Sequence, residues 1–152
     1  MNRILSLFAG LLVIPTIASL SGGSAISLFD GTSLLLVLSV SLLFTSAGHG
    51  PRTTLQAIGA ALSAEPPQQP LVEAHGRVLD SLRSSLRASG AVGFILGIIL
   101  VLQDLGDPSA IGPAVAISLL TLFYALLLAE LCVAPLASGL HARAAAGSPA
   151  DP

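Results

Sequence analysis

Lysine is absent from this sequence, and charge of either sign is scarce. Only 9 % of its 152 residues are charged, whereas a soluble domain usually carries about a quarter. So little charge cannot cover a water-exposed surface, and hydrophobic residues make up 53 % of the chain. The net charge is −2 and arginine supplies all six strong cations, which argues against nucleic acid as a partner.

Groups that could bind a metal or carry catalysis are also few. Cys132 is the single cysteine, which excludes an internal disulfide and a cysteine-based metal site. His49, His75 and His141 are far apart and have no ligand spacing. No nucleophile is accompanied by a base. We therefore expect no metal, no cofactor and no enzymatic activity.

Long apolar runs dominate what is present. At about 1.5 Å per residue, each of four runs can cross a hydrocarbon core roughly 30 Å thick. Because backbone in lipid must satisfy its own hydrogen bonds, these runs should be helices. We predict an all-α membrane protein with one membrane domain (1–143) and transmembrane helices at about residues 4–21, 31–48, 88–104 and 110–137. The first run also resembles a cleavable signal peptide, which is the alternative for it.

The positions of the arginines predict the orientation in the membrane. They fall at the N-terminus, between the second and third runs, and in the C-terminal tail: Arg3, Arg52, Arg77, Arg83, Arg87 and Arg143. The other two connections contain only acidic charges, at Asp30, Asp104 and Asp107. By the positive-inside rule, both termini and the segment 50–87 are cytoplasmic.

The segment 50–87 is predicted to form short amphipathic helices, divided at Pro66, Pro67 and Pro70. We expect the helix after these prolines to run without a break into the third transmembrane helix. Its apolar stripe should pack on a neighbouring helix and consists of Leu71, His75, Val78, Leu79, Leu82 and Leu86. Residues 144–152 are predicted to be a disordered tail.

Glu130 is the one ionisable residue well inside an apolar run. Placing such a group at the centre of a membrane helix costs on the order of 2.5–3.5 kcal/mol. Two interpretations remain open: a proton or ion relay or partner contact, and a carboxylate near the inner headgroups that is hydrated or paired with Arg87. Elsewhere, helical spacing predicts an ion pair between Asp80 and Arg83.

Small residues recur at helical spacing on the last two predicted transmembrane helices. They are Gly90, Gly93 and Gly97 on the third, and Ala114, Ser118, Thr121, Ala125 and Ala129 on the fourth. Such faces let membrane helices approach closely, so we expect them to pack in an antiparallel hairpin. The alternative for Ser118 and Thr121 is that their hydroxyls face a pore.

The stretch 90–140 resembles the MotA/TolQ/ExbB proton-channel family, and its MotA branch most closely. That branch typically has a glycine-rich helix, a DP turn, an IGP helix start and a proline near the end of the last helix. The matching residues are Asp107, Pro108, Ile111, Gly112, Pro113, Leu119, Leu120, Thr121, Tyr124, Ala129, Leu131 and Pro135.

The resemblance implies a homopentamer in the bacterial inner membrane, in which the third and fourth helices line a central pore. It implies contact with lipid and with a partner subunit of MotB/TolR/ExbD type, whose single transmembrane helix carries the aspartate that takes the proton. Ion flow would then turn the pentamer around its partner. The residues of the pore or ion pathway would include Thr121, Ser118, Phe94, Leu122 and Glu130.

Several positions depart from the family pattern. Phe94 and Leu122 stand where threonine or another small residue is usual, so a pore lined by them would be more apolar. Glu130 stands where asparagine is common, and Arg87 replaces a proline. The cytoplasmic segment of about 40 residues lacks room for the torque-bearing domain of flagellar stators, so we do not expect a flagellar motor subunit. Two alternatives remain: a non-conducting oligomer that is a scaffold for a partner or lipid, and a small transporter with Glu130 as its coupling carboxylate.

Overall fold

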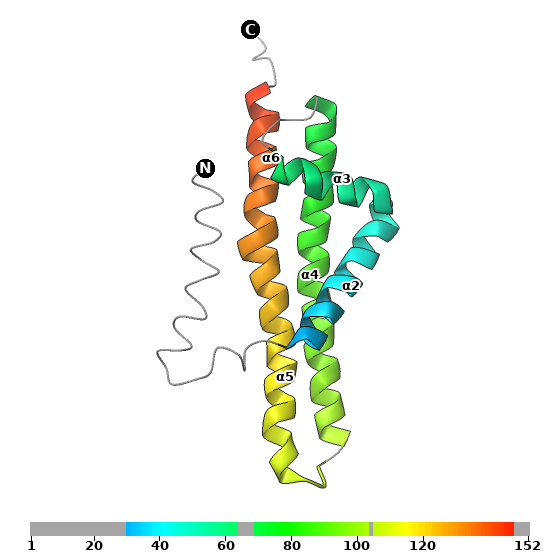
Figure 1. The fold of residues 1–152 in the computed structure, drawn as a ribbon, viewed down its shortest axis with the longest axis vertical. Helices are drawn as coiled ribbons and strands as arrows, with labels where there is room; N and C mark the ends of the chain where they lie inside the picture. The colour runs from blue at the N-terminus through cyan, green and yellow to red at the C-terminus, as the bar shows by residue number, and fades with distance from the viewer. Residues whose placement is uncertain (1–29, 64–68, 104, 148–152) are drawn as a thin grey trace, which may run out of the picture.

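Every regular element in the described part of the chain is a helix (Figure 1). This computed structural model describes residues 30–63, 69–103 and 105–147. The elements are α2 (Gly31–His49), α3 (Pro51–Leu62), α4 (Gln69–Gln103), α5 (Pro108–Leu127), the π-helix η2 (Leu128–Val133) and α6 (Ala134–Gly147). The all-helical class is confirmed. The first predicted transmembrane helix, residues 4–21, lies outside the described residues.

Two long rods form an antiparallel hairpin (Figure 1). One rod is α4, whose 35 residues extend about 52 Å at 1.5 Å per residue. The other consists of α5, η2 and α6, which follow one another without a gap. The prediction that the helix after Pro70 runs without a break into the apolar stretch 88–103 is confirmed, because α4 is unbroken from Gln69 to Gln103.

The second rod begins at a capping aspartate. Asp107 accepts hydrogen bonds from the backbone N–H and the hydroxyl of Ser109, at 2.9 and 2.6 Å. These bonds hold the pKa of the Asp107 carboxyl below its ordinary value, the hydroxyl being the larger cause. Pro108 takes the first helical position, where a missing N–H is harmless. The helix therefore starts earlier than the predicted residue 110, and Pro113 lies inside it rather than near its start.

The shorter helices α2 and α3 pack across the hairpin (Figure 1). Gly50, at a φ of 85°, makes the turn between them, a conformation that other residues adopt only with strain. The core beneath joins α2, α3, α4 and α6 through Val37, Ala57, Val78, Leu79, Leu82, Leu86, Ala137 and Leu140. The predicted stripe on α4 is thus buried, except for Leu71 near the start of that helix, which is 48 % exposed.

The C-terminal helix is longer than the sequence suggests. Residues 144–152 are predicted as a disordered tail, but α6 continues to Gly147. Alanine is the strongest helix former, and the run of alanines at 144–146 extends the helix. Residues 148–152 lie outside the described residues.

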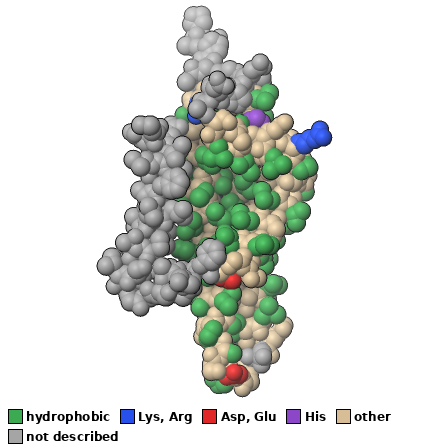
Figure 2. Space-filling model, viewed as in Figure 1, with side chains coloured by type: hydrophobic (Ala, Val, Ile, Leu, Met, Phe, Trp, Pro, Cys, Tyr) green, Lys and Arg blue, Asp and Glu red, His purple; other side chains and the backbone are tan. Residues whose placement is uncertain are grey.

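The surface of these helices suits lipid. Three described segments are long and apolar enough to cross a membrane, namely Gly31–His49, Leu71–Gln103 and Pro108–Ala145. Large hydrophobic side chains are exposed on them, including Phe44 at 68 %, and Figure 2 shows a face covered largely by such side chains. A contiguous exposed surface of this kind is not stable in water. The chain is a membrane protein, and because about 20 residues suffice to cross a bilayer, part of the hairpin extends beyond it.

Candidate functional site

The two rods approach closely along a ladder of small residues. The pairs are Gly90 with Ala125, Gly93 with Thr121, and Gly97 with Ser118. A Cβ added to Gly90 would lie 2.1 Å from the Cβ of Ala125, far inside van der Waals contact. The small faces predicted from helical spacing therefore meet each other, as close packing in a membrane requires.

A chain of hydrogen bonds crosses from α2 to α5 beside this ladder. Thr121 donates its hydroxyl to the Ser33 oxygen at 3.0 Å, and Ser33 donates its hydroxyl to the Asp30 carboxylate. Tyr124 accepts the backbone N–H of Asp30 at 2.8 Å. Ser33 and Thr121 are 4 % and 6 % exposed. These contacts hold the first turn of α2 against α5.

Asp30 lies directly before α2, in the connection where the sequence predicts it, but its contacts are far from the tip of the hairpin. Tyr124, which accepts the Asp30 N–H, and Thr121, which bonds Ser33, lie 16 and 13 residues beyond Pro108, about 24 and 20 Å along the helix axis. Figure 2 shows acidic side chains at two heights on this face of the molecule. No local signal predicts this depth, because it depends on how α2 packs against α5.

Glu130 lies on η2 and bonds two arginines of α4. Arg87 Nε donates to its carboxylate at 2.8 Å, and the guanidinium groups of Arg87 and Arg83 both form ion pairs with it. The pairing with Arg87 matches one of the two interpretations of the sequence. The predicted pair of Asp80 with Arg83 is wrong, because Arg83 extends to Glu130 and Asp80 instead bonds His141 Nε2 at 2.8 Å.

The π-helical turn that carries Glu130 has an identifiable cause. Pro135 has no N–H to donate to the carbonyl of Leu131, and its ring would collide with that carbonyl in a regular α-helix. The wider turn Leu128–Val133 ends two residues before this proline, and we attribute it to the proline. Such turns are frequent at functional sites. Pro135 is the signal that sequence reasoning missed here.

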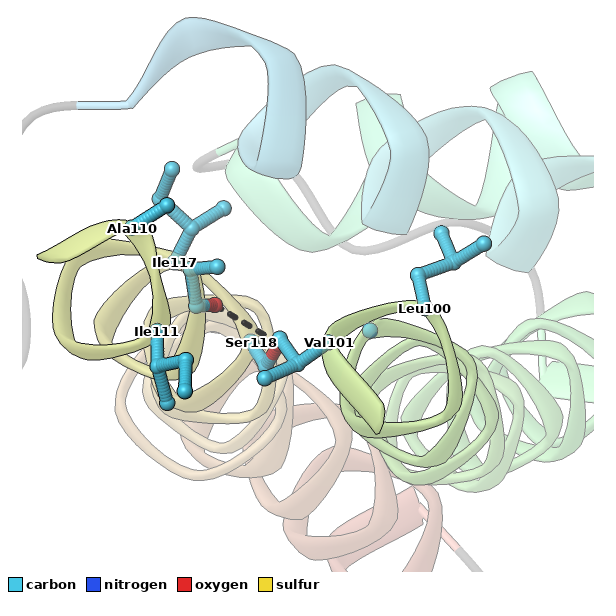
Figure 3. A pocket seen from close by; sticks show the side chains of 8 residues that line it. Leu100, Val101, Ala110, Ile111, Ile117 and Ser118 are labelled. Atoms are coloured by element: carbon cyan, nitrogen blue, oxygen red, sulfur yellow. Dashed lines mark hydrogen bonds between the residues drawn. The ribbon is translucent and has the colours of Figure 1, made fainter. Parts of the chain in front are cut away.

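An apolar groove of about 330 Å³ opens between the rods, on the side of the hairpin tip (Figure 3). It is lined by Gly97, Leu100, Val101, Ala110, Ile111, Ala114, Ile117 and Ser118. Ser118 supplies the hydroxyl in this lining, and it donates to the Ala114 carbonyl on its own helix at 3.0 Å. A molecule bound in the groove would therefore contact mainly apolar surface and would form few hydrogen bonds.

The remaining predicted site residues are dispersed over the hairpin. Phe94 and Leu122, the two apolar departures from the family pattern, are half-buried. Ala129 is fully buried on η2, whereas Gly112 has open space around it. Within the described residues, no three His, Cys, Asp or Glu side chains gather as a metal site.

Known proteins that resemble this chain match it over the packed helices. A profile of the MotA/TolQ/ExbB proton channel family matches residues 35–147. The chain is 41 % identical over 58 residues to motility protein A of Cereibacter sphaeroides, covering 38 % of this chain and 23 % of that protein. It is 39 % identical over 56 residues to chemotaxis protein PomA of Vibrio alginolyticus, covering 37 % and 22 %. It is 38 % identical over 63 residues to motility protein A of Aquifex aeolicus, covering 41 % and 25 %.

The aligned part thus amounts to about a quarter of the length of these curated relatives. The resemblance found in the sequence, including the MotA branch, is confirmed by these matches.

Proposed function

The chain belongs to the MotA/TolQ/ExbB proton channel family, and we propose from this premise that it is the pore-forming subunit of an ion-driven complex in a bacterial inner membrane. The ion is a proton or another small cation, and the complex is a motor or an energy-transducing machine. The family match covers residues 35–147, which begin inside α2 and run to the end of α6.

The observation that carries this proposal is the buried hydroxyl of Thr121 within the tightly packed hairpin. Thr121 is one of the residues that resemble the family motif, and it lies between α4 and α5 against Gly93. It bonds the Ser33 hydroxyl of a third helix at 3.0 Å. Ser33 and Thr121 thus place two hydrogen-bonded hydroxyls in an otherwise apolar layer, and polar groups inside a membrane layer are candidates for an ion pathway.

The family likeness supports a proposal for the assembly. Several copies, a pentamer by resemblance, would surround a single-helix partner of MotB/TolR/ExbD type. Both termini face the cytoplasm, since the arginine-bearing segments lie on that side. The Glu130 cluster lies at the inner boundary, because residues 88–103 and 108–129 carry no charge. Beyond that boundary the hairpin extends into the cytoplasm.

Proton flux into liposomes tests this proposal. The chain would be reconstituted alone and together with a companion that has one transmembrane helix bearing an aspartate. A membrane potential of about 100 mV supplies roughly 2.3 kcal/mol per charge, and a pH-sensitive dye inside the vesicles would report uptake. We expect uptake from the pair and little from the chain alone. An absence of uptake under every pairing rejects the proposal.

A second candidate is a non-conducting oligomer that serves as a scaffold for a partner or lipid. The burial of Thr121 within one protomer favours it, since its hydroxyl bonds other groups of the same chain. Phe94 and Leu122 add apolar bulk where the family usually has smaller residues. Stable binding of the companion without any proton uptake would support this second candidate.

A further inference from the structure

Two arginines of α4 carry more positive charge than their shared carboxylate can balance. Arg83 and Arg87, about one helical turn apart, both form ion pairs with Glu130 of η2. Two cations therefore face one anion. Asp80, the preceding acidic residue on α4, does not supply the missing charge, because its carboxylate bonds His141 at 2.8 Å. The cluster of Arg83, Arg87 and Glu130 thus keeps one positive charge unbalanced.

The two guanidinium groups also keep donors that Glu130 does not use. Each guanidinium carries five N–H donors, whereas the two together make three hydrogen bonds, all of them to Glu130. Arg83 Nε is buried without a partner, and the other N–H groups belong to side chains that are 33 % (Arg83) and 48 % (Arg87) exposed. Planar guanidinium groups match the oxygens of a phosphate, which accept parallel N–H bonds from them.

The level of the cluster along the hairpin indicates where such a phosphate comes from. Residues 88–103 begin directly after Arg87 and carry no charge, and the uncharged residues 108–129 end directly before Glu130. Both rods therefore change from charged to uncharged at one level, as helices do where the headgroups of a bilayer meet its hydrocarbon core. A basic pocket between helices at the cytoplasmic boundary is typical of sites for anionic lipid.

Apolar side chains continue from the cluster toward the hairpin tip. Phe94 and Ile95 follow Arg87 by seven and eight residues, which places them about two turns further along the same side of α4. Leu126 lies about one turn before Glu130 on the second rod, and both Ile95 and Leu126 are about half exposed. A molecule whose phosphate lies on the arginines would thus have apolar surface beside it, which an acyl chain needs and a free phosphate does not.

We propose that Arg83 and Arg87 bind the phosphate of an anionic phospholipid in the cytoplasmic leaflet. Its acyl chains lie along Phe94, Ile95 and Leu126. Glu130 holds the two guanidinium groups side by side and lowers their combined charge, so the site binds one phosphate rather than several. This inference rests on the membrane placement given with the proposed function, and it does not depend on ion conduction.

Lipid selectivity of the full chain in vesicles tests this site with a matched control. Spin-labelled phosphatidylglycerol and phosphatidylcholine report which lipid the protein immobilises. We expect the wild type to prefer phosphatidylglycerol, and Arg87→Gln to weaken that preference about fivefold, the usual contribution of one arginine beside anionic lipid. Arg77→Gln removes the same charge from an exposed position on another side of α4 and should keep the preference. Equal preference in the wild type and Arg87→Gln, or equal losses in both variants, overturns the inference.

Glu130→Gln tests the same site through a gain, which a misfolded protein cannot produce. Both guanidinium groups keep their charge and lose their counter-charge, so the preference for phosphatidylglycerol should rise about fivefold. An unchanged or lower preference in the folded variant overturns the inference. Inorganic phosphate added at constant ionic strength should not displace the lipid, and displacement would overturn it by assigning the site to a free anion. Loss of the lipid preference leaves the proposed function standing, because proton uptake is measured separately.

Discussion

Gly90, Gly93 and Gly97 on α4 leave no room for a side chain because of the facing helix α5. At Gly90 an added Cβ would meet the Cβ of Ala125 at 2.1 Å, and at Gly97 it would meet Ser118 Oγ at 2.2 Å. Gly59 on α3 is also a helical glycine, but a Cβ added to it would have no neighbouring atom within 4 Å. The pair Gly90 and Gly59 therefore separates the effect of close packing from that of helix propensity.

Replacing Gly90 with alanine should destabilise the hairpin by about 1–3 kcal/mol, the usual cost of overpacking, because the two rods must move apart. Gly59→Ala should be neutral or slightly stabilising, since alanine is the better helix former. Thermal unfolding of the purified variants in mild detergent measures both. Equal stability of the two variants would contradict the close approach of α4 and α5.

Glu130 is the residue whose role the sequence leaves most open, and its geometry favours a structural ion pair. Glu130→Gln should lower the melting temperature, because two guanidinium groups lose their counter-charge while remaining side by side. Proton uptake by the protein that still assembles should remain. Glu73→Gln, an exposed change on α4, is the control and should alter neither property. Lost uptake with unchanged stability would instead make Glu130 a relay.

At the scale of elements, the sequence predicts the helices best where they are long and have a clear pattern of apolar residues. The unbroken α4 is predictable because an apolar stripe continues directly into an uncharged run. The position of α2 along the hairpin is not predictable, because a uniformly hydrophobic helix has no pattern that fixes its position along its neighbours. The contacts of Asp30 depend on this level, so the sequence does not predict its network with Ser33 and Thr121.

The π-turn before Pro135 joins α5 to α6. In Pro135→Ala the N–H returns, the turn can tighten to a regular α-helix, and α6 should rotate by about 100°, one residue's turn. A cysteine pair at Asp80 and His141, whose side chains now touch, reports this rotation in a Cys132→Ser background. Disulfide formation should fall in Pro135→Ala and be unchanged in Pro51→Ala. Equal disulfide formation in both variants would show that the turn does not depend on Pro135.

At the scale of the whole molecule, the hairpin presents apolar surface well beyond the contacts of one protomer. Ile95 and Leu100 on α4 and Ile117 on α5 are each about half exposed, at 56 %, 58 % and 53 %. Lipid, further copies and a partner helix can all cover such surface. A hairpin that carries a buried polar route inside an apolar exterior is consistent with an ion-conducting oligomer.

We propose that ions pass along the hairpin beside Thr121, and proton uptake measures this most directly. Liposomes that contain this chain with its single-helix companion would be compared between the wild type and Thr121→Val. Valine preserves the shape of threonine and removes its hydroxyl. We expect uptake by the wild-type pair, a loss of about tenfold or more in Thr121→Val, and the same amount of assembled complex in both. Equal uptake by the two, or no uptake by the wild-type pair, would contradict it.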